Sequence, residues 1–197
     1  SIPYYEQGIA DTLRQHHVGQ RFPTTLLNHP SARTLLHEWL KDKGFNDTQK
    51  AEMTHLRDEQ PGKLWESRTH RVALDRGCLT WEEKGTDKVT SEARIIVQPV
   101  EAMGAFSNEW IYCDADLLSA PLTMRRAQTG DRFVPFGMKG MKLVSDVLTN
   151  RKINRFQRER QHVLCCGEDI VWLIGIQADN RFRVTDKTTR IVQISIK

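Results

Sequence analysis

The sequence predicts an α+β protein: a helical unit with a β-hairpin over residues 1–87, then a β-rich, sandwich-like domain with one inserted helix over residues 88–197. Apolar residues recur at helical spacing as far as about residue 58, and strand-like runs follow from residue 63 onward. Residues 83–91 are polar apart from Val89, which favours a domain boundary there. With 197 residues, 39% of them hydrophobic, the chain can build its core.

Two amphipathic helices are expected first. Residues 3–17 form one of them, because apolar residues recur at every fourth position: Tyr5, Ile9 and Leu13. After a loop at residues 21–28, Pro30 favours the first turn of the second helix, and Gly44 ends it. The buried face of this second helix comprises Leu35, Leu36, Trp39 and Leu40.

A third helix and a hairpin complete the N-terminal unit. Asn46 followed by Gln49 has the pattern of a capping box, so a helix is expected from there to about Asp58, before the stop at Pro61-Gly62. The turn residues Asp75-Arg76-Gly77 join two short apolar runs, 68–74 and 78–82, which predicts a β-hairpin.

The C-terminal half is mainly strand-like. Runs with strand character occur at 93–100, 109–114, 121–126, 162–166, 170–176, 181–185 and 190–196. In the last run Val192, Ile194 and Ile196 alternate with polar residues, so one face is expected to be buried and the other wet. Strands at this spacing favour a sandwich-like domain.

One helix is expected among these strands, over residues 141–150. It follows Gly137 and Gly140 directly, so its free N–H groups and positive dipole end should open onto the preceding loop. Gly137–Lys142 is therefore the expected centre of an anion site, with Lys139 and Lys142 beside it.

The positive charge of the chain is concentrated in one segment, residues 125–160. This segment has ten basic residues and three acids, a balance of +7, whereas the other 19 basic and 22 acidic residues give −3. The basic residues are Arg125, Arg126, Arg132, Lys139, Lys142, Arg151, Lys152, Arg155, Arg158 and Arg160. With Gly140 they form the set of candidate RNA-binding residues, because basic side chains beside glycine turns suit phosphate.

Two interpretations of this segment compete. A charged run is often a solvated face, whereas glycines among the charges allow backbone N–H groups to approach an anion. Phe133, Phe136 and Phe156 lie among the arginines and are expected either to stack on a nucleotide base or to pack locally. Asp131 is expected to orient Arg132, or to close the turn with a bond to a nearby N–H, rather than to act as a general acid.

Several classes of function find no support in the sequence. It contains no Gly-x-x-x-x-Gly-Lys-Ser/Thr, Gly-x-Ser-x-Gly, Gly-x-Gly-x-x-Gly or His-Glu-x-x-His motif, so no catalytic residue is assigned. The seven histidines are scattered and no metal site is predicted. Four cysteines without paired spacing are expected to be reduced and mostly buried. Without a long apolar run or a secretory signal pattern, the expected location is cytoplasmic, with no membrane partner.

The order of motifs in the second half resembles a known family. Three motifs occur in this order: Gly130-Asp131-Arg132-Phe133, Lys142-Leu143 and Ile170-Val171-Trp172. They are accompanied by Arg125, Pro135, Gly137, Gly140, Lys152-Ile153, Arg158, Arg160, Gly175 and Arg181. Together these residues resemble the C-terminal domain of tRNA(Ile)-lysidine synthase. The first half resembles the helical linker domain of the same family more loosely. The residues concerned are Leu35-Leu36-His37-Glu38-Trp39-Leu40, Gly62-Lys63 and Ser67-Arg68-Thr69-His70-Arg71.

The resemblance implies a role in tRNA modification. Members of the family use ATP, with magnesium, to join lysine to the wobble cytidine of an isoleucine tRNA, and their C-terminal domains hold the tRNA, including its acceptor stem. The Ser-Gly-Gly-x-Asp-Ser loop of their N-terminal ATP pyrophosphatase domain is not in this sequence. We therefore expect no bound cofactor and no ligase activity from these residues alone, with tRNA and the catalytic domain as partners. The alternative is a protein-interaction module that docks an acidic partner or that catalytic domain.

Overall fold

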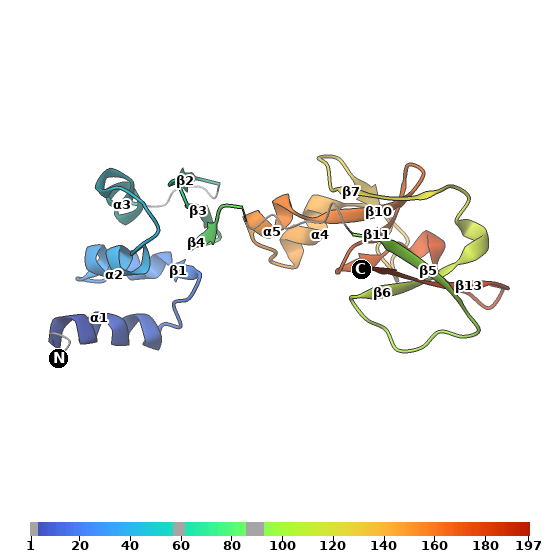
Figure 1. The fold of residues 1–197 in the computed structure, drawn as a ribbon, viewed down its shortest axis with the longest axis horizontal. Coiled ribbons are helices and arrows are strands. Elements are labelled where there is room, and N and C mark those ends of the chain that lie inside the picture. Colours follow the sequence, from blue (N-terminus) through green and yellow to red (C-terminus); the bar gives the residue numbers. More distant parts are fainter. Residues whose placement is uncertain (1–3, 57–61, 86–92) are drawn as a thin grey trace. The chain divides into compact units, whose positions relative to one another are not determined.

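The computed structural model describes residues 4–56, 62–85 and 93–197. The chain forms two compact units, Ser1–Lys88 and Val89–Lys197, which are described separately below (Figure 1). The boundary predicted between residues 87 and 88 lies outside the described residues, as does Asp58, the expected end of the third helix.

The three helices expected in the first unit are present. They are α1 (Tyr4–Gln15), α2 (Ala32–Trp39) and α3 (Asp47–Thr54). The capping box is confirmed, because the Asn46 side chain accepts from the Gln49 amide at 2.8 Å while the Gln49 side chain accepts from the Asn46 amide at 3.1 Å. α3 is shorter than expected and ends at Thr54.

The hairpin belongs to a four-stranded antiparallel sheet. Its strands are β1 (Arg21–Pro23), β2 (Leu64–Glu66), β3 (His70–Asp75) and β4 (Cys78–Glu83), in the order β1-β4-β3-β2. Arg76 and Gly77 both have positive φ, 49° and 71°, which is the type I′ turn that suits a two-residue hairpin. The loop expected at residues 21–28 instead forms β1 and the 3₁₀ helix η1 (Thr24–Asn28).

The second unit is a sandwich of two antiparallel sheets. One contains β5 (Ile95–Val100), β13 (Ile191–Ile196) and β6 (Trp110–Asp114), in the order β5-β13-β6. The other contains β12 (Gln177–Ala178), β11 (Asp169–Leu173), β10 (His162–Cys166) and β7 (Leu122–Arg126), in that order. Leu164, Val171 and Trp172 of the second sheet share a core with Ile111, Val192 and Ile194 of the first. The α+β class and the sandwich-like domain are thus as predicted.

A helix covers the other face of the four-stranded sheet. Val144, Val147 and Leu148 of α4 (Val144–Asn150) share a second core with Val163, Cys165 and Ile170 of the sheet (Figure 1). The neighbouring thiols Cys165 and Cys166 belong to different cores, as alternation along β10 requires. All four cysteines are free, and Cys113, Cys165 and Cys166 are buried.

The helices and one strand of the second unit differ from the prediction. A second short helix, α5 (Arg155–Glu159), follows α4, so two helices and not one interrupt the strands. The strand expected at residues 181–185 is wrong, because this region holds the 3₁₀ helix η3 (Asn180–Phe182) and a loop. A third 3₁₀ helix, η2 (Ala115–Leu117), follows β6.

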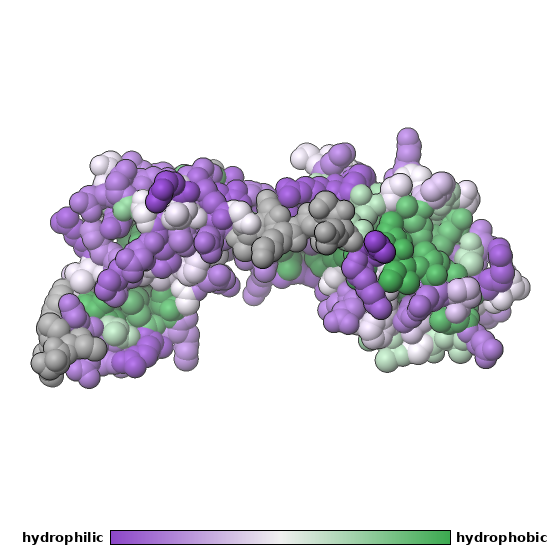
Figure 2. Space-filling view, viewed as in Figure 1, coloured by the Kyte–Doolittle hydropathy of each residue, from purple (hydrophilic) through white to green (hydrophobic). Residues whose placement is uncertain are grey.

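The surface of the second unit is not uniformly polar. Figure 2 shows apolar residues gathered over the region of β5 and β13 on the face in view, and Val97 of β5 is 44% exposed. β5 is an edge strand of its sheet, a position that tolerates Pro99 because no neighbour needs its missing N–H.

Candidate nucleic-acid interface

The basic segment 125–160 forms the end of β7, the pair β8–β9 (Arg132–Phe133 and Lys142–Leu143), α4 and α5. We call its exposed side the basic face. Arg126, Arg132, Lys139, Gly140, Lys142, Arg151 and Lys152 are exposed on it, whereas Arg125, Arg155, Arg158 and Arg160 are half-buried. Because α4 packs with one stripe on the sheet, its other side and the loops around it lie toward solvent.

Arg132 and Lys142 meet at one shallow hollow on this face. The two strands that carry them pair antiparallel, with Arg132 opposite Leu143 and Phe133 opposite Lys142. Both residues line a hollow of about 430 Å³ together with residues of α4. The one acid at this hollow is Asp146, which is exposed in the first turn of α4. The hollow therefore has two cationic side chains that an approaching phosphate could contact.

Asp131 closes the turn before β8 and orients an arginine, but the arginine is Arg125 and not Arg132. Its carboxylate accepts from the Arg125 guanidinium at 2.8 and 2.9 Å and from the Gln128 amide at 2.8 Å. Its side chain is 12% exposed. Burial alone would raise the pKa of Asp131, but the Arg125 guanidinium and the Gln128 amide outweigh burial and hold the pKa below its ordinary value.

We expect Asp131→Ala to destabilise the second unit by about 2–3 kcal/mol, because the half-buried Arg125 and the Gln128 N–H lose their acceptor. The native pair should contribute stability that is fully present above the ordinary Asp pKa of about 4 and is lost as pH falls through the lowered pKa. Urea unfolding at several pH values measures both effects. Glu168→Ala, which removes an exposed acid from the β10–β11 turn, is the control. If acidification lowers the free energy of unfolding of Asp131→Ala as much as that of the native chain, the carboxylate does not have this role.

The loop at residues 134–138 is fixed from a distant part of the chain. Asn180 donates its backbone N–H to the Val134 carbonyl at 2.7 Å, and its side chain bonds the Gly137 N–H at 3.1 Å and the Met138 carbonyl at 2.9 Å. Gly137 has φ 83°, which this turn requires. Asp179-Asn180 has the composition of a turn, and nothing in the local sequence predicts that it anchors this loop.

The expected convergence of a helix N-terminus with the glycine loop is wrong. Lys142 and Leu143 are in a strand, so the helix begins at Val144 and not at Met141. The Val144 N–H already donates to the Asp131 carbonyl at 2.9 Å. Gly140 does not have the left-handed conformation of Gly137, and there is space for a side chain at its Cα. RNA contact by Gly140 and the basic residues stays a prediction. A helix N-terminus is no longer part of the predicted site.

The three phenylalanines of the basic segment differ in their exposure to solvent. Phe133 and Phe156 are buried, at 0% and 2% exposure, so local packing accounts for both. Phe136 is 48% exposed and lies 6.4 Å, between ring centroids, from Phe106 of the loop before β6. Burial depends on the fold and not on neighbouring arginines in sequence, which is why the sequence could not separate them.

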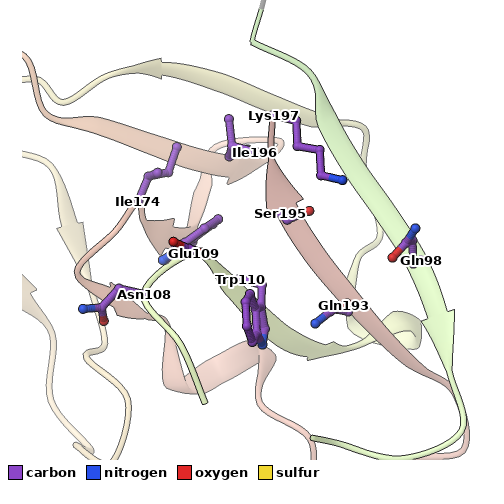
Figure 3. A pocket seen from close by; sticks show the side chains of 10 residues that line it. Gln98, Asn108, Glu109, Trp110, Ile174, Gln193, Ser195, Ile196 and Lys197 are labelled. Carbon is purple, nitrogen blue, oxygen red and sulfur yellow. The ribbon is translucent and has the colours of Figure 1, made fainter. Parts of the chain in front are cut away.

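A second hollow, of about 560 Å³, is lined by residues of both sheets of the sandwich. Gln98, Gln193 and Ser195 extend from β5 and β13 at its wall, near Trp110 and Lys197 (Figure 3). Its lining is mostly amide, hydroxyl and apolar, and Glu109 is its one carboxylate. Among the described residues no three His, Cys, Asp or Glu side chains are arranged to hold a metal ion. No helix in the described ranges is both long and apolar enough to cross a membrane.

Comparison with known proteins identifies the family. A model described as the TilS substrate binding domain matches residues 23–84, and one described as the TilS substrate C-terminal domain matches residues 122–195. Together the two models match well over half of the chain. The chain belongs to the TilS family. The resemblance noted in the sequence is thereby confirmed for both units.

Curated relatives named tRNA(Ile)-lysidine synthase support this assignment. The protein of Bacteroides thetaiotaomicron is 41% identical over 172 residues, covering 85% of this chain and 40% of that protein. The protein of Parabacteroides distasonis is 36% identical, covering 86% and 42%. The chain thus spans about two-fifths of the length of these TilS relatives. A crystal structure of a TilS C-terminal domain aligns at 24% identity with a TM-score of 0.46, covering 53% of this chain and 83% of that one.

Proposed function

We propose that this chain binds tRNA and holds it for lysine ligation. The observation that carries the proposal is the basic face of the second unit, where Arg132 and Lys142 share one hollow and Arg126, Arg151 and Lys152 are also exposed. Duplex RNA is recognised mainly by its shape, phosphates and 2′-hydroxyls, which suits an exposed cationic surface better than a deep pocket.

The relatives' name supplies the reaction in which the tRNA would be used. We infer that the ligand is an isoleucine tRNA, that its acceptor stem lies on the basic face, and that lysine is attached to its wobble cytidine elsewhere in the enzyme. ATP and magnesium would then serve a catalytic domain that is not part of these 197 residues. A tRNA ligand also implies a cytoplasmic protein.

A titration of the chain against tRNA at two salt concentrations tests the proposal. If about four phosphates are contacted, the log–log slope of affinity against salt should be about −2.8 to −3.6, so affinity should fall roughly 50- to 150-fold between about 0.05 and 0.2 M salt. Electrophoretic mobility shift or fluorescence anisotropy measures this. Binding to an acidic protein together with no binding to tRNA at the lower salt would instead support the protein-interaction alternative.

A further inference from the structure

A small cleft in the second unit lies beside the basic face. It has a volume of about 180 Å³ and is formed by the loop before β6, by β6, and by the segments around Phe136 and Gln177. Four aromatic residues and two arginines are part of its lining: Phe106, Trp110, Tyr112, Phe136, Arg151 and Arg183. Part of this lining comes from residues 101–112, which lie between the two regions matched by the family models.

Two of the aromatic rings are held toward solvent. Phe106 is 76% exposed and Phe136 is 48% exposed, with their planes tilted by 49°. The backbone on both sides is fixed: the Phe136 N–H donates to the Ala178 carbonyl at 2.9 Å, and Trp110 Nε1 donates to the Ala105 carbonyl at 3.1 Å. Two neighbouring aromatic rings that are exposed and held in place by polar contacts offer a surface on which a planar ligand can stack.

The charges around the rings are positive. Arg151, directly after α4, donates to the Gln177 side chain at 3.0 Å, and Gln177 donates to the Phe136 carbonyl at 3.2 Å. Arg183 donates to the Asn180 carbonyl at 3.0 Å. The one acid in the lining is Asp179, whose side chain is fully buried and bonded to Arg181. The cleft therefore combines aromatic faces with two guanidinium groups and no exposed carboxylate.

We propose that this cleft binds an unpaired nucleotide, with the base stacked on Phe106 or Phe136 and the phosphate on Arg151 or Arg183. Unpaired bases stack on aromatic rings and on arginine planes, and a duplex offers its bases no such access. Arg151 belongs both to the basic face and to the cleft, so one RNA could occupy both. The inference rests on the proposed function in that the basic face holds the adjoining duplex.

Two RNA hairpins test the proposal, one with a blunt end and one with a single-stranded extension that contains 2-aminopurine. The native chain should bind the extended hairpin roughly 5- to 150-fold more tightly, the range expected for stacking one base. Stacking should also quench the 2-aminopurine fluorescence. At least one of Phe106→Ala and Phe136→Ala should remove most of both effects while leaving affinity for the blunt hairpin unchanged.

The control is Leu117→Ala, which removes a 44% exposed apolar side chain outside the cleft. It should retain the preference for the extended hairpin. Because Phe106 is itself so exposed, its replacement should leave the thermal unfolding midpoint unchanged, which separates loss of stacking from loss of fold. Equal native affinity for the two hairpins, or a preference that survives both phenylalanine variants, overturns the cleft proposal alone. Failure of the native chain to bind either hairpin overturns the proposed function with it.

Discussion

Replacing Asp179 by alanine should destabilise the second unit by about 3 kcal/mol or more. The Asp179 side chain is 0% exposed, and its carboxylate accepts from the Val134 N–H at 2.9 Å, the Arg181 N–H at 2.7 Å and the Arg181 guanidinium at 2.9 Å. Removal of this carboxylate leaves a buried N–H without its acceptor and deprives a partly buried guanidinium of one of its two carboxylate partners. Such losses are among the costliest that one substitution produces.

Urea unfolding followed by near-ultraviolet circular dichroism measures the effect. Asp186→Ala is the matched control, since Asp186 is an exposed acid seven residues further along the chain and the same charge is lost. Arg181 also bonds Asp169 at 2.7 Å, so a milder loss is expected from Asp169→Ala. If Asp179→Ala and Asp186→Ala unfold at the same urea concentration, the carboxylate does not have the structural role assigned to it.

The features that the sequence predicted best are local ones. The Asn46–Gln49 capping box and the Arg76-Gly77 turn involve residues within four positions of each other, and both formed as expected. The alternation of Val192 and Ile194 along β13 likewise depends only on the strand's own period. Each of these patterns determines the local structure without a contact to a distant residue.

The errors occurred where a distant segment decides the structure. Lys142 and Leu143 were expected in or beside a helix, but they pair with Phe133 and Arg132 across the intervening loop, and this shifts the helix start to Val144. Strands of two or three residues such as β8, β9 and β12 are too short to show a period.

The same reason separates the site residues that could be predicted from those that could not. The excess of positive charge in residues 125–160 is visible in composition, whereas the sharing of one hollow by Arg132 and Lys142 depends on strand pairing. Asp179 and Asn180 have the composition of a turn, yet their side chains bond Val134 and Gly137, more than 40 residues earlier in the chain. Nothing in the local sequence distinguishes such anchors from ordinary turn residues.

The double substitution Arg132→Ala/Lys142→Ala should weaken tRNA binding on the order of tenfold or more at about 0.1 M salt and reduce the log–log salt slope by about 1.5. The expected size follows from the loss of two phosphate contacts at one hollow, each of which releases close to one counterion. Both side chains are exposed, so the fold should persist, and circular dichroism can confirm that it does. Anisotropy titrations at several salt concentrations measure affinity and slope together.

Two further variants decide whether the hollow itself, and not overall charge, is responsible. Arg94→Ala/Lys187→Ala removes two exposed charges outside residues 125–160 and should leave the slope within about half a unit of the native value. Asp146→Asn removes the one acid at the hollow and should strengthen binding a few-fold, because a negative charge no longer faces the phosphate. This expected gain in affinity is opposite in sign to the loss expected from Arg132→Ala/Lys142→Ala. If both double variants reduce the slope equally, tRNA responds to net charge. If Asp146→Asn has no effect, the tRNA does not lie on the hollow between β8, β9 and α4.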